Sequence, residues 1–352
     1  MKRKNTRKIY VADVLIGGKS PITIQSMTTS KTYDVESVVK EIKTLEAAGC
    51  QIIRASLPDM DSVKAIPQIK EQIDIPLIGD IHFNYKLALA AIDRGIDKIR
   101  INSGNIGSRE KVENVLAKAQ DFNIPIRIGV NSGSLEKDIL EKYGHPTADA
   151  MLESAEKHLK ICQEFGFQDL VFSLKSTNVP LMIEVNRKFS KKYSYPLHLG
   201  VTEAGTGWKA MVKSSLGIGT LLAEGIGDTI RVSLTDDPVE EIKAGLQILR
   251  TLGLAPGGLD IISCPTCARA QVNLVPLVKE LEKRTEHIKK NLTVAVMGCA
   301  VNGPGEAREA DIGIACGKNS GILFKKGEVI ETIPEDEMIA RLIEELENFP
   351  EK

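Results

Sequence analysis

The chain lacks the features that mark membrane, secreted and nucleic-acid-binding proteins. Its 352 residues hold no uninterrupted apolar run near the roughly 18 residues that span a bilayer. Asp13 and the pair Gly17-Gly18 interrupt any signal-like stretch after the basic N-terminus. The net charge of −1 gives no electrostatic attraction to nucleic acid or to anionic membranes. We therefore expect a cytoplasmic protein with no nucleic acid and no membrane as a partner.

Cysteines are also scarce. Six in 352 residues are too few for a disulfide scaffold, and a reducing compartment keeps them as thiols. Four of the six, Cys264, Cys267, Cys299 and Cys316, fall in the last quarter of the chain. Their placement, rather than their number, points to chemistry in the C-terminal part.

The chain is longer than one hydrophobic core usually supports, so two domains are expected. From residue 20 to about 250, short β-branched runs alternate with helix-period stretches. The strand candidates are Ile22–Met27, Ile52–Leu57, Pro76–His82, Lys98–Asn102, Pro125–Asn131, Leu170–Lys175, Leu197–Glu203 and Thr229–Leu234. Eight strand–helix units of this length predict a (β/α)8 TIM barrel. An open doubly wound sheet is the rival, but no G-x-G-x-x-G follows an early strand.

The alternation of strands and helices stops near the Ala-Pro-Gly-Gly of residues 255–258, and Leu254–Ile262 is expected to be a linker. Beyond it the pattern predicts a small α+β domain. We therefore expect a barrel domain over residues 1–253 and a second domain over 254–352.

Polar and charged residues recur at the ends of the predicted barrel strands. Residues two apart in a strand share a face, and catalytic groups gather at the carboxyl ends of barrel strands. The residues concerned are Arg54, Asp80, His82, Arg100, Asn102, Arg127, Asn131, Ser173, Lys175, Glu203, Arg231 and Ser233. Burying so many cations near one mouth is costly unless an anion compensates them. Because guanidinium groups suit phosphate oxygens, the implied substrate is a small, multiply charged anion such as a diphosphate.

Two titratable residues in this group are candidates for proton transfer. His82 and Glu203 stand among the cations, where a carboxyl or imidazole group can donate or accept a proton. The alternatives are a hydrogen-bonded ring without a proton role for His82 and an arginine salt bridge for Glu203.

The cysteines of the C-terminal part form a spaced motif. Cys264-Pro-Thr-Cys267 is followed by Cys299-Ala-Val-Asn302-Gly-Pro-Gly-Glu306. Thiolates in glycine-rich turns favour an iron–sulfur cluster over structural zinc, which generally takes four Cys or His ligands. Cys316 and Glu306 compete as the fourth ligand; Glu306 is narrowly preferred, since Cys316 reads as a small core residue of a strand.

With Asp80-Ile-His82-Phe and Val201-Thr-Glu203-Ala-Gly, this motif closely resembles the 4-hydroxy-3-methylbut-2-enyl diphosphate synthase family over essentially the whole chain. The resemblance implies a [4Fe–4S] cluster on Cys264, Cys267, Cys299 and Glu306. The implied substrate is 2-C-methyl-D-erythritol 2,4-cyclodiphosphate of the non-mevalonate pathway, reduced by flavodoxin or ferredoxin. The implied diphosphate site comprises Arg54, Arg100, Arg127, Asn131, Lys175, Arg231 and Ser233, with Glu203 as the proton donor and with His82 and Asn302 lining the site. Asp80 and Asn102 are also expected to bind the substrate.

The expected linker also bears on assembly. The last barrel helix ends at the face opposite the catalytic mouth, and about eight linker residues reach at most roughly 28 Å. We therefore expect a head-to-tail homodimer in which the cluster domain of one chain caps the barrel of the other. The rival functions are another barrel reductase, a pterin- or corrinoid-linked transferase, an electron carrier and a zinc-stabilised scaffold.

Overall fold

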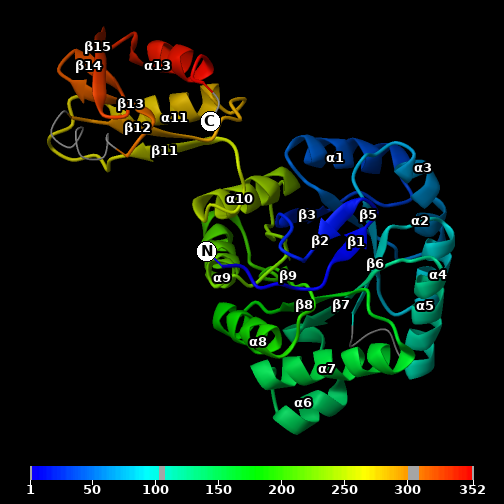
Figure 1. Ribbon diagram of the computed structural model, residues 1–352. Helices are drawn as coiled ribbons and strands as arrows, with labels where there is room; N and C mark the ends of the chain where they lie inside the picture. Colours follow the sequence, from blue (N-terminus) through cyan, green and yellow to red (C-terminus); the bar gives the residue numbers. More distant parts are fainter. Residues whose placement is uncertain (1, 103–107, 300–308, 351–352) are drawn as a thin grey trace. The chain divides into compact units, whose positions relative to one another are not determined.

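The computed structural model of the protein describes residues 2–102, 108–299 and 309–350. The chain divides into two compact units, Met1–Ala255 and Pro256–Lys352, where the sequence predicted a boundary between residues 253 and 254. Figure 1 shows both units. Substrate binding by the first unit and cluster binding by the second stay predictions.

Eight parallel strands form the sheet of the first unit. They are β3 (Thr23–Met27), β4 (Ile52–Ser56), β5 (Leu77–Ile81), β6 (Lys98–Asn102), β7 (Ile126–Asn131), β8 (Leu170–Lys175), β9 (His198–Leu199) and β10 (Thr229–Ile230). Their order in the sheet is β8-β7-β6-β5-β4-β3-β10-β9. A bridge between Phe172 of β8 and Leu197, just before β9, joins the two edges. The unit is the predicted TIM barrel, and the open doubly wound sheet is excluded.

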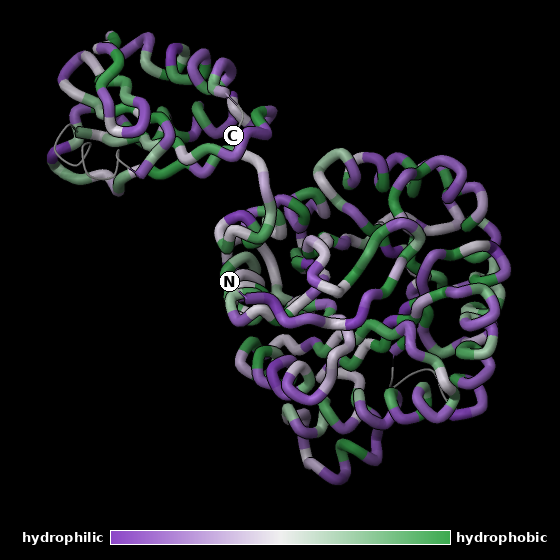
Figure 2. Tube along the Cα trace, viewed as in Figure 1, coloured by the Kyte–Doolittle hydropathy of each residue, from purple (hydrophilic) through white to green (hydrophobic). Residues whose placement is uncertain are grey.

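Helices enclose the strands (Figure 1). They are α1 (Val35–Ala47), α2 (Met60–Lys64), α3 (Ile66–Lys70), α4 (Tyr85–Asp93), α5 (Arg109–Asp121), α6 (Lys137–Tyr143), α7 (Ala148–Phe165), α8 (Val179–Lys192), α9 (Gly207–Ala223) and α10 (Pro238–Thr251). Several begin at a residue that accepts a hydrogen bond from a free N–H of the first turn, as Asp34 and Asn178 do. The helices alternate hydrophobic and hydrophilic residues (Figure 2), and the buried side of α1 carries Val38, Ile42 and Leu45.

A hairpin that the sequence analysis missed closes the amino-terminal end of the barrel. Strands β1 (Ile9–Val11) and β2 (Val14–Ile16) pair in antiparallel fashion. Val11 and Ile16 pack against Ile52 and Ile78 at the start of β4 and β5. Because this end is plugged by apolar side chains, the carboxyl end is the open mouth of the barrel.

The inner face of the barrel is polar where β6 crosses it. Lys98, Arg100 and Asn102 alternate with Ile99 and Ile101, and all five are buried. The two isoleucines belong to the hydrophobic core under the helices, so the three polar residues point to the barrel interior. The alternation of this strand therefore places charge inside the barrel.

The second unit is a small α+β domain, as predicted. Its sheet contains β11 (Leu259–Ser263), β12 (Leu292–Met297), β13 (Ile312–Gly317), β14 (Ser320–Lys325) and β15 (Glu328–Pro334) in sequential order, and the described part of the unit includes the helices α11 (Leu274–Arg284) and α13 (Met338–Glu347). The pairs β11–β12 and β12–β13 are parallel, and the last two pairs are antiparallel. The prediction of a linker over Leu254–Ile262 is therefore partly wrong, because β11 begins at Leu259. Among the described residues, no helix is long and apolar enough to cross a membrane; the cytoplasmic location stays a prediction.

Candidate active site

Charged residues predicted at the strand ends meet on the inner face of the barrel. In the parallel register, Asp80 of β5 pairs with Arg100 of β6, which pairs with Arg127 of β7. Arg54 of β4 lies beside Asp80, with its Nε 3.7 Å from the carboxylate. All four side chains are buried. The sheet itself, rather than a loop, therefore sets their positions.

Asp80 is the acidic centre of this group. Its Oδ1 accepts a hydrogen bond of 3.0 Å from Arg100 Nη1 and lies 3.5 Å from His82 Nε2. Arg100 Nη1 also lies 2.9 Å from His82 Nε2. Burial raises the pKa of Asp80, but Arg54, His82 and Arg100 outweigh it and hold the pKa well below its ordinary value. Asp80 is therefore an ionised carboxylate that orients its neighbours.

Three buried cations dominate the rest of the interior. Burial lowers the pKa of Arg54 to about 10, and the attraction of Asp80 offsets this only in part. Burial and the surrounding arginines hold the pKa values of Arg127 and Lys175 well below their ordinary range. Arg127 Nη1 donates to Gln25 Oε1 at 3.1 Å. Positive charge is thus unfavourable here, and an anion placed among these groups relieves the cost.

Two glycines make room for these side chains. A Cβ on Gly129 of β7 would lie 2.8 Å from Arg100 Nε, and a Cβ on Gly200 would lie 2.8 Å from Lys175 Nζ and 2.5 Å from the carbonyl oxygen of Arg231. Any other residue at either position would displace a cation. Neither glycine was predicted from the sequence as part of the site, although a glycine inside a strand, as Gly129 is, signals the close approach of another group.

Arg231 follows β10 and is held by a helix residue that the sequence analysis also missed. Its Nε and Nη2 donate to the two carboxylate oxygens of Glu241 at 3.2 and 3.3 Å. Glu241 lies on α10, is buried, and also accepts from Ser26 Oγ at 3.1 Å and from the backbone N–H of Leu234 at 3.0 Å. This network fixes the guanidinium group at the mouth.

The two proton-transfer candidates lie at the rim. The His82 side chain is 39% exposed. Glu203 is exposed and was wrongly placed in a strand, because β9 ends at Leu199 and Glu203 lies in the loop before α9. Its φ of 51° is a left-handed conformation that costs a non-glycine residue about 1–2 kcal/mol. Such strain marks the loop as a candidate functional segment.

The remaining predicted binding residues are uncharged. Asn102 is buried at the end of β6 and donates from Nδ2 to Ser134 Oγ at 3.1 Å. Asn131 ends β7 in register with Lys175. Ser233 is half-buried. It was expected inside a strand over Thr229–Leu234, but β10 ends at Ile230 and Ser233 lies in the loop that follows.

In the second unit, cysteines follow two adjacent strands. Cys264 comes directly after β11, and Gly298 and Cys299 directly after β12, which is its parallel neighbour. The backbone N–H of Gly298 donates to Cys264 Sγ at 3.3 Å. The loop that carries Cys267 returns to the same place, because the N–H of Gln271 donates to the Gly298 carbonyl at 2.9 Å.

This donor set suits an iron–sulfur group, since thiolates accepting backbone N–H bonds are its characteristic ligands. Cys316 is buried in β13 within the hydrophobic core, and burial raises the pKa of its thiol to about 11, as expected of a core residue. Asn302 and Glu306 lie outside the described residues. Within the described ranges, no three His, Cys, Asp or Glu side chains are grouped as metal ligands.

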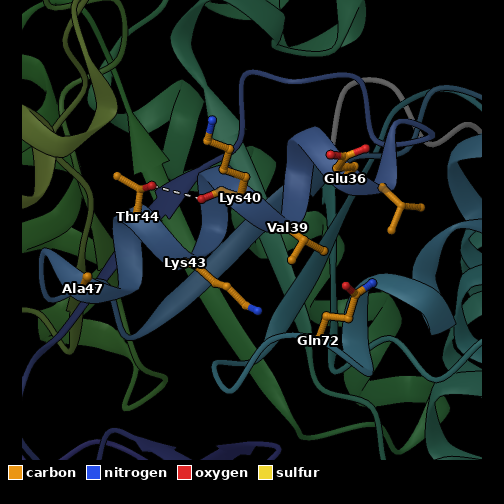
Figure 3. Close-up of a pocket in the computed structure, with 8 residues that line it drawn as sticks. Glu36, Val39, Lys40, Lys43, Thr44, Ala47 and Gln72 are labelled. Atoms are coloured by element: carbon orange, nitrogen blue, oxygen red, sulfur yellow. Dashed lines mark hydrogen bonds between the residues drawn. The ribbon is translucent and has the colours of Figure 1, made fainter.

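A surface hollow lies away from these residues, on α1. Figure 3 shows it lined by Glu36, Val39, Lys40, Lys43, Thr44, Ala47 and Gln72. The Thr44 hydroxyl donates to the carbonyl oxygen of Lys40 at 3.0 Å, which is an ordinary bond within a helix. None of the predicted site residues lines this hollow.

Comparisons with known proteins find a family match for each of the two units. Residues 6–246 match the model of the GcpE TIM-barrel domain, and residues 260–348 match that of the GcpE protein C-terminal domain. The chain is 58% identical over 349 residues to a 4-hydroxy-3-methylbut-2-en-1-yl diphosphate synthase (flavodoxin) of Clostridium perfringens, covering 99% of this chain and 100% of the relative. The synthase of the same name from Thermodesulfovibrio yellowstonii is 53% identical, covering 98% and 99%.

Two solved structures match this chain over about 70% of its length, at low sequence identity. A dihydropteroate synthase of Yersinia pestis has a TM-score of 0.51 at 11% identity and covers 71% of this chain and 100% of its own. A truncated 3-deoxy-D-arabino-heptulosonate 7-phosphate synthase of Thermotoga maritima has a TM-score of 0.51 at 14% identity, covering 70% and 94%. At such identities only the fold is shared. The full-length sequence matches decide the rest: the chain belongs to the 4-hydroxy-3-methylbut-2-en-1-yl diphosphate synthase family, a family of oxidoreductases.

Proposed function

We propose that the chain opens and reduces 2-C-methyl-D-erythritol 2,4-cyclodiphosphate to 4-hydroxy-3-methylbut-2-enyl diphosphate, with reduced flavodoxin or ferredoxin as the electron donor. The balanced reaction takes up two electrons and two protons, breaks the ring C–O bond to phosphate, and releases a hydroxyl as water. The observation that carries the proposal is the excess of buried positive charge at the barrel mouth, which a diphosphate neutralises.

The barrel residues divide into two roles. We assign Arg54, Arg100, Arg127, Lys175 and Arg231 to binding the diphosphate, with Asn102, Asn131 and Ser233 as hydrogen-bonding groups beside them. Asp80 is assigned to orienting Arg54 and Arg100, since its carboxylate would itself repel a diphosphate. Fixed cations keep the substrate in place while its ring opens.

Glu203 is the proposed proton donor to the leaving hydroxyl, and His82 and Asn302 are proposed to line the site. The exposed position of Glu203 and its left-handed backbone support this role. Among the described residues, no arginine forms an ion pair with its carboxyl group. A general acid positioned in this way contributes typically about 10²–10⁴-fold to a rate.

Cys264, Cys267, Cys299 and Glu306 are the proposed ligands of a [4Fe–4S] cluster, which supplies single electrons to the substrate when it is bound. The test is iron and sulfide analysis of anaerobically purified protein. We expect Cys267→Ser to lose most of its iron and the core variant Cys316→Ala to keep it. Zinc in place of iron in the parent protein, or equal iron in both variants, would contradict the ligand set.

The head-to-tail homodimer also stays a proposal. Three exposed apolar residues, Trp208, Val212 and Leu216, lie four apart along α9 and are 70%, 47% and 57% exposed, so they form one stripe. This stripe begins beside the Glu203 loop and supports burial against a second copy.

Mixing two inactive variants tests the dimer. In a head-to-tail dimer, Glu203→Gln has an intact cluster domain and Cys299→Ala an intact barrel, so each heterodimer holds one complete site. Because half of randomly mixed dimers are heterodimers, we expect about a quarter of the parent activity after subunit exchange. No recovery, with exchange verified by a tagged subunit, would contradict a shared active site.

Turnover tests the function itself. We expect the purified protein, kept free of oxygen and supplied with a chemical reductant, to convert the cyclodiphosphate into the linear diphosphate. Failure to consume it while the cluster is intact would refute the assignment.

A further inference from the structure

A lysine lies inside the barrel in the layer beneath the proposed diphosphate site. Lys98 is the first residue of β6 and shares the inner face with Arg100, two residues and roughly 7 Å further along the strand. Its side chain is fully buried. Among the described residues, its Nζ has no hydrogen-bond partner.

The charged groups that act on Lys98 in the described part of the chain are cations. Arg127 of β7 and Arg54 of β4 act on it electrostatically, and both repel its charge. His198 of β9 lies in the same field: it is buried, its Nδ1 is 3.4 Å from Thr229 Oγ1, and its Nε2 has no partner within the described part of the chain. Burial and these neighbours hold the pKa values of Lys98 and His198 well below their ordinary range.

The fold does not require an amine at this position. In the sheet register Lys98 is paired with Ile78, which packs with Ile52 and the N-terminal hairpin in an apolar cluster. An apolar side chain therefore suits this layer, and it would remove a buried donor that lacks a partner. Groups that break the packing rules of a core in this way are expected where function requires them.

We propose that Lys98 is a positioning residue for the diphosphate: it supplies, from beneath Arg100 and Arg127, a positive charge that is stabilised only when the anion is bound. This inference rests on the proposed function. Anion binding then draws a proton onto the amine, because the added negative charge offsets the repulsion by the two arginines. Substrate affinity is thereby coupled to proton uptake in the barrel interior.

The test compares Lys98→Met with Lys98→Arg in the full-length, anaerobically purified protein. The matched control is Lys111→Met, an exposed lysine of α5. Thermal melting is measured first, and calorimetric titration with the cyclodiphosphate is then run in two buffers of different ionisation enthalpy, which reports the protons taken up on binding.

We expect Lys98→Met to melt at a higher temperature than the parent protein, because an unpaired buried donor has been replaced by an apolar chain of similar length. The same variant should bind the cyclodiphosphate at least about tenfold more weakly and take up fewer protons on binding than the parent protein, since Lys175 and His198 remain. Lys98→Arg should keep more of the affinity but also take up fewer protons than the parent protein, since arginine stays charged in the free and the bound state. A merely structural lysine would give lower melting without a change in uptake.

Equal affinity and equal proton uptake in the parent protein and Lys98→Met would overturn this inference alone. Failure of the parent protein to bind the cyclodiphosphate would instead overturn the proposed substrate site. Lys111→Met should match the parent protein in all three measurements.

Discussion

Replacing Asp80 by asparagine should remove the counter-ion that lets two arginines stay buried in the barrel. Arg100 Nη1 lies 3.0 Å and Arg54 Nε 3.7 Å from the carboxylate, and the three side chains are at most 10% exposed. Breaking a buried ion pair by removing one partner costs about 3–5 kcal/mol, because the remaining charge is uncompensated. At about 2–4 °C per kcal/mol for a domain of this size, Asp80→Asn should melt roughly 6–20 °C below the parent protein.

Differential scanning calorimetry on the anaerobic protein measures this shift. Asp138→Asn is the control, because Asp138 pairs with Lys157 at 2.8 Å but its side chain is 67% exposed, and such pairs contribute about 0–1 kcal/mol. The cyclodiphosphate should restore part of the lost stability in Asp80→Asn, since its phosphates neutralise the same arginines. Melting of Asp80→Asn within a degree or two of Asp138→Asn would refute the idea that the arginines depend on this carboxylate.

The pH dependence of stability gives a second test of the ion pairs between Asp80 and its arginines. The pKa of Asp80 is lower in the folded protein than its ordinary 3.8, so its contribution to stability is present above pH 3.8 and is lost as the pH falls through the lowered value. The difference in melting temperature between the parent protein and Asp80→Asn should therefore be constant at neutral pH and shrink below pH 3.8. A difference that persists unchanged in acid would contradict the ionised state.

Two further outcomes follow from the site. Glu203→Gln should lower turnover at least about a hundredfold, as loss of a general acid does, while cluster absorption stays unchanged; near-normal turnover would remove Glu203 from the acid role. Glu241→Gln should raise KM about tenfold, because the guanidinium group that it clamps through two contacts at the mouth is released. Its neighbour Glu240→Gln, which breaks only a half-exposed contact with a lysine, should leave KM unchanged.

The sequence predicted the barrel well where the strands are long and regular. Strands β3 to β8 lie where β-branched runs predicted them, since a parallel strand covered by helices needs apolar residues on its outer face. The two errors are β9 and β10, which end at Leu199 and Ile230. Their apolar and β-branched residues continue for several positions, but Gly200 approaches the Arg231 carbonyl and the backbone turns at Glu203.

The parts of the site that escaped prediction depend on contacts between distant segments. In the sequence, Glu241 is one of two acidic residues in the first turn of a predicted helix. Only the folded chain shows that it forms an ion pair with Arg231. Lys98 shares the inner face with Arg100, yet nothing in the sequence distinguishes a buried amine from a strand-end lysine in solvent. The hairpin β1–β2 is short, and its packing against Ile52 and Ile78 is a tertiary contact without a local signal.

The central claim is that buried cations of the barrel bind the diphosphate of the substrate. Steady-state kinetics of Arg127→Met test it most directly, because this side chain is 1% exposed and we expect an apolar replacement to offset the lost bond to Gln25 by removing an unfavourable buried charge. We expect KM for the cyclodiphosphate to rise at least about tenfold while iron content and melting temperature are maintained. A KM equal to that of the parent protein would show that the anion binds elsewhere.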